Sequence, residues 1–250
     1  MNNCGNVAES EFITTALRDL CGTRPGARVL DLGCGAGEMV SRLRRSGFDA
    51  WGCDSREFIT RFSGGEYLLD ITASPYRLPA EDNSFDAVMS CSVLEHAQNK
   101  EDIFREIHRV LKPGGVTIHF LPGKYYLPSE PHIYVPLVNW FWPHVPKWWL
   151  ALWSIAGIRN EFQQDHGWRE TLAANVNYCK AGLSYWPHRR YKRVVTMVFG
   201  NCRFPDDYFV RMAVGGAARF ARSIPIPHKL TGWFLARIRM GILLATKNSE

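Results

Sequence analysis

Glu130 and His132 lie two residues apart in the proline-rich stretch "YYLPSEPHIYVP". A histidine whose ring is supported by a carboxylate can take a proton from a substrate near neutral pH, so the pair is a candidate general base. The stretch follows the carboxyl end of a predicted strand, and ligands bind at this end of parallel sheets. The alternative is a loop whose polar side chains only face solvent.

Two further histidines lie in or near predicted strands. His96, in "VLEHA", follows the predicted strand over residues 85–91 and is another candidate for proton transfer. Packing or capping of its loop is the alternative role. His119 alternates with apolar Ile118 and Phe120, so we expect a buried, hydrogen-bonded histidine rather than a base.

A glycine-rich loop, "VLDLGCGAGE", places Gly33, Gly35 and Gly37 between an apolar run and a helical pattern. Such glycines let the backbone approach a ligand, and the N-terminus of the following helix favours an anionic group. The spacing differs from the G-x-G-x-x-G of dinucleotide sites. The carboxylate of Asp31 would also gain little from a pyrophosphate. The methionyl end of S-adenosylmethionine fits better, because it has a carboxylate for the loop and an ammonium for Asp31.

Asp54 ends the next predicted strand, 17 residues after Gly37. A carboxylate at this position can accept hydrogen bonds from both hydroxyls of a ribose. Nicotinamide dinucleotides and S-adenosylmethionine both contain this sugar, so Asp54 does not distinguish between them.

The elements that must position these residues alternate along the first half. Hydrophobic periodicity predicts helices over residues 9–21, 38–47 and 100–115, and strands over 27–33, 48–54, 66–70, 85–91 and 115–121. This alternation predicts an α/β fold with a doubly wound, Rossmann-like, mostly parallel sheet. A last, antiparallel strand is predicted over residues 239–247.

The pattern changes after Leu121, where the next 37 residues contain six prolines and five tryptophans and show no strand period. We predict one helix near 147–157 there, then a helix at 168–182 and a strand at 191–199. The chain is assigned to a single domain over residues 1–250. Its parts are a cofactor-binding half, 1–121, and two helical acceptor or lid insertions, 122–165 and 205–236.

The motifs of the first half are "VLDLGCGAGE", "WGCD", "LLDITASPYRLPAEDNSFDAV", "SCSVLEH" and "IFREIHRVLKPGG". In order and spacing they resemble the class I S-adenosylmethionine-dependent methyltransferases, the group that includes the ubiquinone and menaquinone biosynthesis type, over about residues 27–121. The resemblance implies S-adenosylmethionine as cofactor, with its methionine portion along the glycine loop. Asp54 would bind the ribose, and Asp70 with the backbone of Ile71 the adenine. Ser55 and Cys91 are also expected to line this site. A nicotinamide-dependent reductase is the alternative.

Charge and aromatic residues are distributed unevenly. Residues 1–120 carry a net charge of −4 and residues 121–250 one of +10, and the second half holds eight of the nine tryptophans. The longest apolar run has 11 residues, too few to span a bilayer. The aromatic segment is therefore interpreted as a lid, an anchor at a lipid surface or a protein interface.

Cysteines and the first residues indicate the compartment. The seven cysteines include no CxxC pair, so we expect reduced thiols and no metal site. The N-terminus lacks the pattern of a secretion signal, which predicts a cytoplasmic protein. Nucleic acid is disfavoured, because the basic residues are scattered through an apolar segment.

Together these observations predict O-methylation of a bulky glycan or isoprenoid-type acceptor, and leave open whether this acceptor is lipid-linked. Methylation of a small soluble metabolite and a cofactor-binding scaffold without activity are the alternatives. The expected partners are the acceptor and, in the lipid-surface interpretation, the inner membrane surface.

Overall fold

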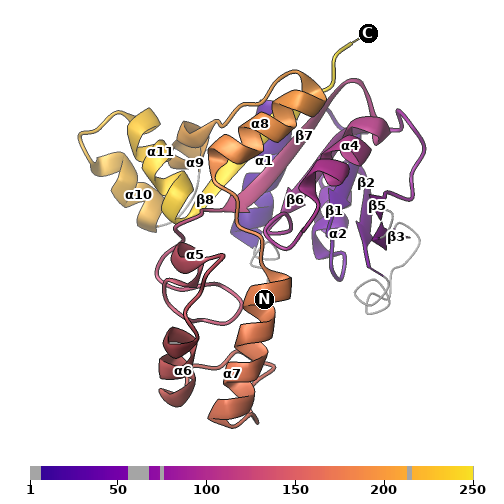
Figure 1. Ribbon diagram of the computed structural model, residues 1–250. Helices are drawn as coiled ribbons and strands as arrows, with labels where there is room; N and C mark the ends of the chain where they lie inside the picture. Colours follow the sequence, from indigo (N-terminus) through magenta and orange to yellow (C-terminus); the bar gives the residue numbers. More distant parts are fainter. Residues whose placement is uncertain (1–6, 56–67, 74–75, 213–215, 250) are drawn as a thin grey trace.

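The computed structural model describes residues 7–55, 68–73, 76–212 and 216–249. Its centre is a six-stranded sheet in the order β3-β2-β1-β6-β7-β8 (Figure 1). Neighbouring strands are parallel except β7 and β8, which are antiparallel. The strands are β1 (Arg28–Leu32), β2 (Asp49–Asp54), β3 (Leu68–Asp70), β6 (Phe85–Cys91), β7 (Leu111–Pro122) and β8 (Met240–Thr246). A two-stranded antiparallel ribbon consists of β4 (Thr72–Ala73) and β5 (Tyr76–Arg77).

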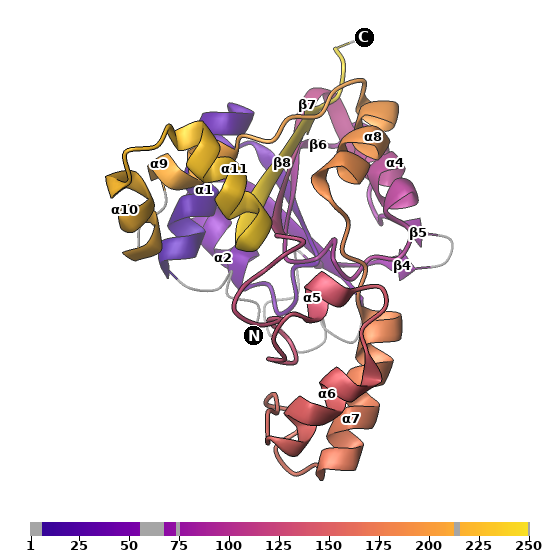
Figure 2. The same ribbon diagram turned by 60° about the vertical axis from the view of Figure 1, so that its left-hand side comes forward.

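Helices cover both faces of the sheet (Figures 1 and 2). Successive strand residues point to opposite faces, so Val88 of β6 packs in one core and Met89 in the other. The central strands are therefore apolar on both sides, which explains their continuous apolar sequence. The core containing Met89 is covered by α1 (Val7–Cys21) and α2 (Glu38–Arg45), and the core containing Val88 by α4 (Lys100–Val110) and α8 (His188–Phe199). The predicted doubly wound fold is confirmed.

The chain between β7 and α8 forms a small helical unit beyond the carboxyl end of β7 (Figure 2). It has a hydrophobic cluster of its own, in which Val135, Leu150 and Tyr185 are buried and Trp149 and Trp153 are partly buried. Its elements are α5 (Val138–Phe141), α6 (Lys147–Ile155), α7 (Trp168–Asn177) and the π-helix η3 (Tyr178–Gly182). This unit, residues 123–187, is called the cap below.

Three helices precede β8 (Figure 1): α9 and α11 pack beside the strand, and α10 packs on α9. They are α9 (Asp206–Met212), α10 (Gly216–Ser223) and α11 (His228–Ile238). The C-terminal end of α11 also meets the start of the cap, where the Gly123 N–H donates to the Arg239 carbonyl (2.8 Å). None of the helices in the described ranges is long and apolar enough to cross a bilayer.

Two sequence predictions of secondary structure are wrong. The predicted strand at 191–199 lies within α8, because Tyr191, Val194, Val195 and Phe199 fall on one helical face and pack in the core shared with α4. The predicted helix at 100–115 ends at Val110, before the Lys-Pro-Gly-Gly turn, and the backbone is extended from there into β7.

Candidate functional site

The glycine loop joins β1 to α2 at the carboxyl end of the sheet. Gly33, Gly35 and Gly37 all have positive φ, at 75°, 54° and 79°. Two features exclude a side chain at Gly33. Its φ is positive, and a Cβ atom there would lie 2.3 Å from a methyl carbon of Val93. The loop therefore presents backbone rather than side chains at the start of α2.

Asp54 ties the end of β2 to this loop. Its Oδ2 accepts a hydrogen bond from the Gly35 N–H (2.8 Å), and its Oδ1 accepts one from the Ser55 N–H (2.7 Å). Gly52, which the sequence analysis did not select, makes this approach possible, since a Cβ atom there would lie 2.7 Å from Cys34 Sγ. The structure thus brings together Gly35, Asp54 and Ser55, three of the residues that the sequence analysis assigned to the cofactor.

Asp31 is buried at the end of β1, beside the glycine loop. Burial, reinforced by the charge of Asp54, raises the pKa of its carboxyl to about 8. A cationic ligand group beside this carboxylate would replace the lost hydration and favour its charged form. An ammonium group is therefore chemically suited to this position.

The remaining expected cofactor residues follow the neighbouring strands. Asp70 pairs with Asp54 across β2 and β3, and the Ile71 N–H donates to the Asp54 carbonyl (3.0 Å). The side chain of Asp70 lies outside the described part of the structure. Cys91 ends β6 and is disulfide-bonded, so the prediction of reduced thiols is wrong for this residue. The cysteines that are free are Cys21, Cys34, Cys53, Cys179 and Cys202.

His96 and His132 were separate candidates in the sequence and are in contact in the structure. Their Nε2 atoms are 3.3 Å apart. His96 Nδ1 lies 2.7 Å from the Gly182 carbonyl, which can only accept a hydrogen bond, so this nitrogen carries a proton. Burial lowers the pKa of His96, which leaves its Nε2 unprotonated and able to accept from His132.

Glu130 completes this chain from inside the cap. Its Oε1 lies 2.9 Å from His132 Nδ1 and accepts a longer hydrogen bond from the Tyr185 hydroxyl (3.3 Å). Its Oε2 accepts from the backbone N–H groups of His132 and Ile133 (2.8 and 2.9 Å). Glu130 has 0% exposed surface, so the alternative of a solvent-facing loop is wrong for it. Burial opposes the charged form of His132, but the hydrogen bond and charge of Glu130 prevail and raise its pKa.

Proton positions follow from these contacts. When His132 is protonated it donates through Nδ1 to Glu130 and through Nε2 to His96, and the raised pKa of His132 beside the lowered pKa of His96 favours this arrangement. The two facing Nε2 atoms hold one proton between them, and removal of that proton leaves two lone pairs at this point. The pair is then a base whose remaining contacts fix its orientation.

Glu95 and Lys100 are two further charged residues buried beside His96. Neither carboxylate oxygen of Glu95 has a hydrogen-bond partner, and its Oε1 lies 3.9 Å from His96 Nε2. Burial raises the pKa of Glu95 to about 7 and lowers that of Lys100 to about 7. Lys100 Nζ donates to the carbonyls of Ala97 and Ser184 (2.6 and 2.7 Å), which fastens the last residues of the cap to the loop after β6. The sequence analysis quoted Glu95 within its motif without assigning it a role.

His119 is buried and hydrogen-bonded, as predicted. Thr117 Oγ1 donates to the Val88 carbonyl (3.1 Å) and accepts from His119 Nε2 (2.7 Å), so His119 Nδ1 accepts from the Ser90 hydroxyl (2.7 Å). Burial lowers the pKa of His119 to about 3, which keeps the ring neutral. In the part of the chain that is described, no three His, Cys, Asp or Glu side chains are grouped as metal ligands would be.

Comparison with known proteins identifies the first half of the chain. Residues 30–119 match the family described as "Methyltransferase domain". The sterol 24-C-methyltransferase of Gibberella zeae is 34% identical over 104 residues, which are 38% of this chain and 27% of that protein. The ubiquinone biosynthesis O-methyltransferase of Roseobacter denitrificans is 32% identical over 126 residues, 45% of this chain and 51% of that protein. The matched segment thus spans about half or less of these relatives.

Solved structures share the whole fold. A SAM-dependent methyltransferase from Archaeoglobus fulgidus has a TM-score of 0.52 at 15% identity, over 95% of this chain and 94% of that one. The phosphoethanolamine N-methyltransferase 2 of Haemonchus contortus, solved with S-adenosylmethionine, has a TM-score of 0.52 at 16% identity, over 94% of this chain and 52% of that one. The predicted resemblance to class I methyltransferases and the predicted fold are confirmed.

Proposed function

From this methyltransferase domain, we propose that the protein transfers the methyl group of S-adenosylmethionine to a hydroxyl group of a bulky glycan or isoprenoid-type acceptor. The observation that carries the proposal is the chain from Glu130 through His132 to His96, between the cap and the end of the sheet. A hydroxyl is a poor nucleophile until its proton is removed, whereas many amine acceptors need no base. A half-buried, carboxylate-supported histidine pair is suited to this task.

The residues around the glycine loop fit the cofactor. The backbone of the loop and the N-terminus of α2 would face its carboxylate, and buried Asp31 its ammonium. Asp54 would accept hydrogen bonds from the ribose hydroxyls, with Ser55 and Cys91 nearby and Asp70 and Ile71 towards the adenine. When bound, S-adenosylmethionine supplies a methyl group on a positively charged sulfur. The chain itself holds the acceptor in line with this methyl group and excludes water.

The histidine pair takes the proton that the acceptor loses. Once the shared proton has left, His132 Nε2 is the accepting atom, because His132 Nδ1 stays hydrogen-bonded to Glu130. Glu130 then stabilises the imidazolium that forms, and His96, fixed by Gly182, orients the ring. The acceptor proton would move to His132 Nε2 as the hydroxyl oxygen accepts the methyl group that the bound cofactor would supply.

Exposed apolar side chains on the cap, α10 and α11 favour an acceptor that lies at a lipid surface. Trp149 and Trp153 pack inside the cap, but Trp148 is 64% exposed and Phe162 78% exposed. Exposed aromatic side chains next to basic ones suit the headgroup region of a membrane, so we extend the proposal to reversible attachment at the inner membrane surface.

Methyl transfer is tested with labelled S-adenosylmethionine and a cell extract divided into lipid and aqueous fractions. Label is expected in a hydroxyl-bearing molecule of the lipid fraction, and His132→Ala should lower the rate by about 10² to 10⁴ with cofactor affinity intact. His144→Ala, at an exposed histidine of the cap, is the matched control. Label only in a small aqueous metabolite would contradict the acceptor class, and near-normal turnover of His132→Ala would contradict the base.

A further inference from the structure

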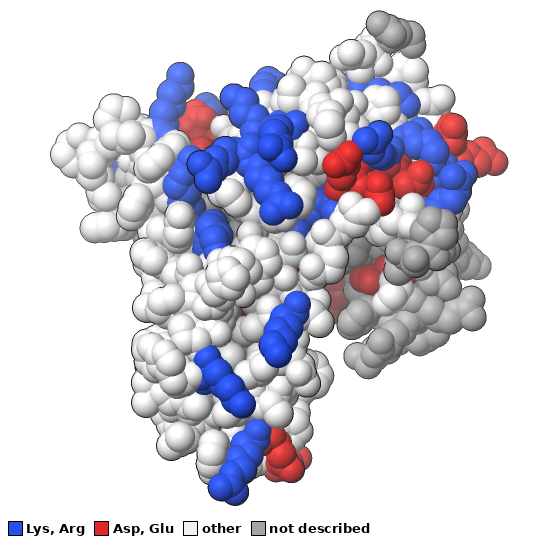
Figure 3. All heavy atoms as spheres, in the orientation of Figure 1, with Lys and Arg blue, Asp and Glu red and all other residues white. Residues whose placement is uncertain are grey.

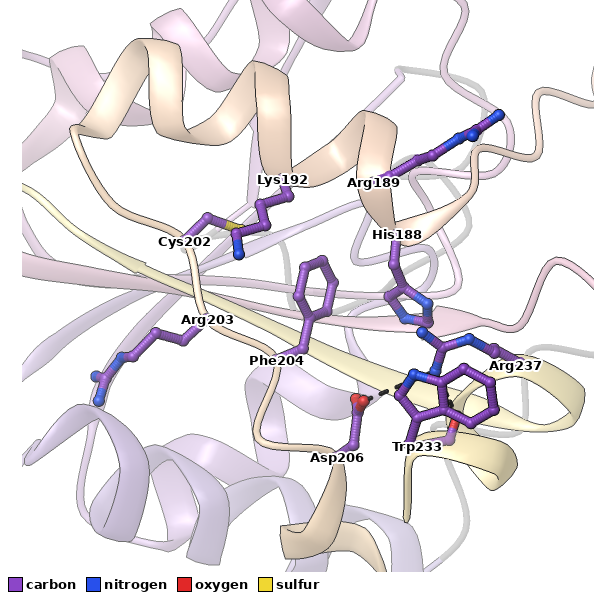
Figure 4. Close-up of a pocket in the computed structure, with 9 residues that line it drawn as sticks. All are labelled: His188, Arg189, Lys192, Cys202, Arg203, Phe204, Asp206, Trp233 and Arg237. Atoms are coloured by element: carbon purple, nitrogen blue, oxygen red, sulfur yellow. Dashed lines mark hydrogen bonds and ion pairs between the residues drawn. The ribbon is translucent and has the colours of Figure 1, made fainter. Parts of the chain in front are cut away.

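A cavity of about 500 Å³ lies between α8, residues 202–206 and α11 (Figure 4), and neither His96 nor His132 is among the residues that line it. Its lining includes four cationic side chains, Arg189, Lys192, Arg203 and Arg237, and one acid, Asp206. These residues come from the start of α8, the segment that follows this helix, and the more distant α11. The cavity therefore has a net charge of +3 when His188, also in its wall, is neutral.

Most of this positive charge is not neutralised within the protein. In the described ranges, no carboxylate lies within ion-pair distance of Arg189, Lys192 or Arg203. Asp206 Oδ2 lies 4.0 Å from Arg237 Nη1, the limit of an ion pair. Figure 3 shows Lys and Arg gathered over α8 and α11 on this face, with few acidic residues between them. An anionic ligand would meet attraction here without first displacing an internal partner.

The walls of the cavity hold some of these groups in place. The backbone of Arg203 is paired with Leu244 of β8 through two hydrogen bonds (2.8 and 2.9 Å). Arg237 stacks on the Trp233 ring at 3.7 Å and donates to its carbonyl. Figure 4 shows Trp233, Arg237, Asp206 and His188 together at one end and Lys192 reaching down from α8, whereas the side chains of Arg189 and Arg203 start at the rim and point outwards in opposite directions.

The N-terminus of α8 adds to the positive electrostatic potential of the cavity. His188 and Arg189, its first two residues, line the cavity, and its N-cap, Pro187, offers no side-chain hydrogen bond. The positive end of the helix dipole and its unpaired N–H groups are thus close to the cationic side chains. Phe204 and Trp233 provide apolar surface for whatever is attached to the anion.

We propose that this cavity binds a phosphoryl group, as a phosphate or diphosphate ester. The Lys192 ammonium and the Arg237 guanidinium, near the N-terminus of α8, match its several oxygens and its double charge, and Arg189 and Arg203 add positive charge at the rim. The cavity is larger than one phosphate, and the aromatic wall accommodates the group that the ester carries. The binding does not depend on methyl transfer and can be measured without it.

The surroundings favour a lipid as the source of this phosphate. Phe220 and Leu230, on α10 and α11, are 69% and 59% exposed. Phe234 on α11, next to Trp233, is exposed as well. A phosphate at the head of a lipid would enter the cavity while these side chains contact its apolar part. A soluble phosphate ester would use the same cations and leave the apolar side chains unused.

Calorimetric titration of the full chain with inorganic pyrophosphate tests the site. The double variant Lys192→Gln/Arg203→Gln should bind about tenfold more weakly or worse, since it loses the charge-assisted contact of Lys192 and the positive charge of Arg203 at the rim. Arg193→Gln/Arg45→Gln removes the same charge from exposed positions outside the cavity and should bind like the wild type. All four side chains are exposed, and unchanged thermal unfolding confirms that both variants fold.

Two results would overturn the proposal: no pyrophosphate binding by the wild type, or equal weakening in both double variants. Flotation with phosphatidic acid vesicles and phosphatidylcholine vesicles distinguishes a lipid phosphate from a soluble phosphate ester. For a lipid phosphate, pyrophosphate should release the protein from phosphatidic acid vesicles, and the cavity variant should bind them less than its control. If pyrophosphate binds at the cavity and vesicle binding is unaffected, the phosphate comes from a soluble ester.

Discussion

Replacement of Glu130 by glutamine tests the proton chain most directly. One side of the Glu130 carboxylate accepts two backbone N–H groups, and the other accepts from His132 Nδ1 and the Tyr185 hydroxyl. A glutamine keeps the backbone contacts by directing its carbonyl to them. Its NH₂ group then faces His132 Nδ1, and two donors cannot bond to each other. His132 must therefore move its proton to Nε2, the atom that would take the acceptor proton.

The size of the effect follows from the contact that is lost. A hydrogen bond to a charged group is worth about 1.5 to 3 kcal/mol, so the plateau rate should fall by about 10- to 150-fold. Glu130 also holds the pKa of His132 above its ordinary value, against the effect of burial. His132 acts as a base only when deprotonated, so the wild-type rate rises with pH through this raised pKa. Without the carboxylate, the effect of burial lowers the pKa of His132, so the rising limb of the pH–rate profile moves to lower pH.

The assay is methyl transfer at saturating cofactor across pH, with cofactor affinity measured by calorimetry. Asp165→Asn, at an exposed acid of the cap, is the matched control and should keep both the plateau and the limb of the wild type. A merely structural role for Glu130 would lower the rate without moving the limb. A Glu130→Gln limb at the wild-type pH, or a plateau within about twofold of wild type, would refute the reasoning.

Three other outcomes are expected. Asp54→Ala should weaken S-adenosylmethionine binding by about 1.5 to 3 kcal/mol in calorimetry, and unchanged affinity would place the ribose elsewhere. Asp31→Asn should raise the unfolding temperature of the cofactor-free protein at pH 7 while weakening cofactor binding. The pKa of Asp31 is about 8 in the folded protein and lower in the unfolded chain. The folded state therefore resists ionisation of this carboxyl, and the stability of the wild type rises as pH falls from 8 towards 4. The protein should float with anionic vesicles at low salt and less at high salt. Failure to float at low salt would favour the interpretation of the aromatic segment as a lid, together with a soluble acceptor.

Local sequence was sufficient to predict the central strands and the glycine loop at their carboxyl ends. The strands that carry Asp31, Asp54 and Cys91 are short apolar runs ended by polar or small residues, and each lies where the pattern predicted it. Glycine spacing likewise predicted the loop, because positive φ and close packing leave few other residues there. These features depend on neighbours in the chain and so can be read from it.

Features that depend on distant contacts could not be read in this way. The contact between His96 and His132 joins residues 36 positions apart across the boundary of the cap, and nothing in either motif indicates it. The burial of Glu95 results from packing by the last residues of the cap. In α8, the β-branched residues Val194 and Val195 led to the prediction of a strand, whereas the segment is a helix whose apolar face packs against the sheet.

The separate core of the cap has a consequence for how such enzymes diversify. Glu130 and His132 belong to the cap, whereas Asp31, Asp54 and the glycine loop belong to the sheet, and the two parts bury different hydrophobic clusters. An ancestral sheet could therefore exchange one cap for another without rebuilding its own interior. Under the proposed function, such an exchange would change the recognised acceptor and the proton-accepting group in a single event, while the methyl donor stayed the same. Acceptor choice and acid–base chemistry would then be inherited together, as one module.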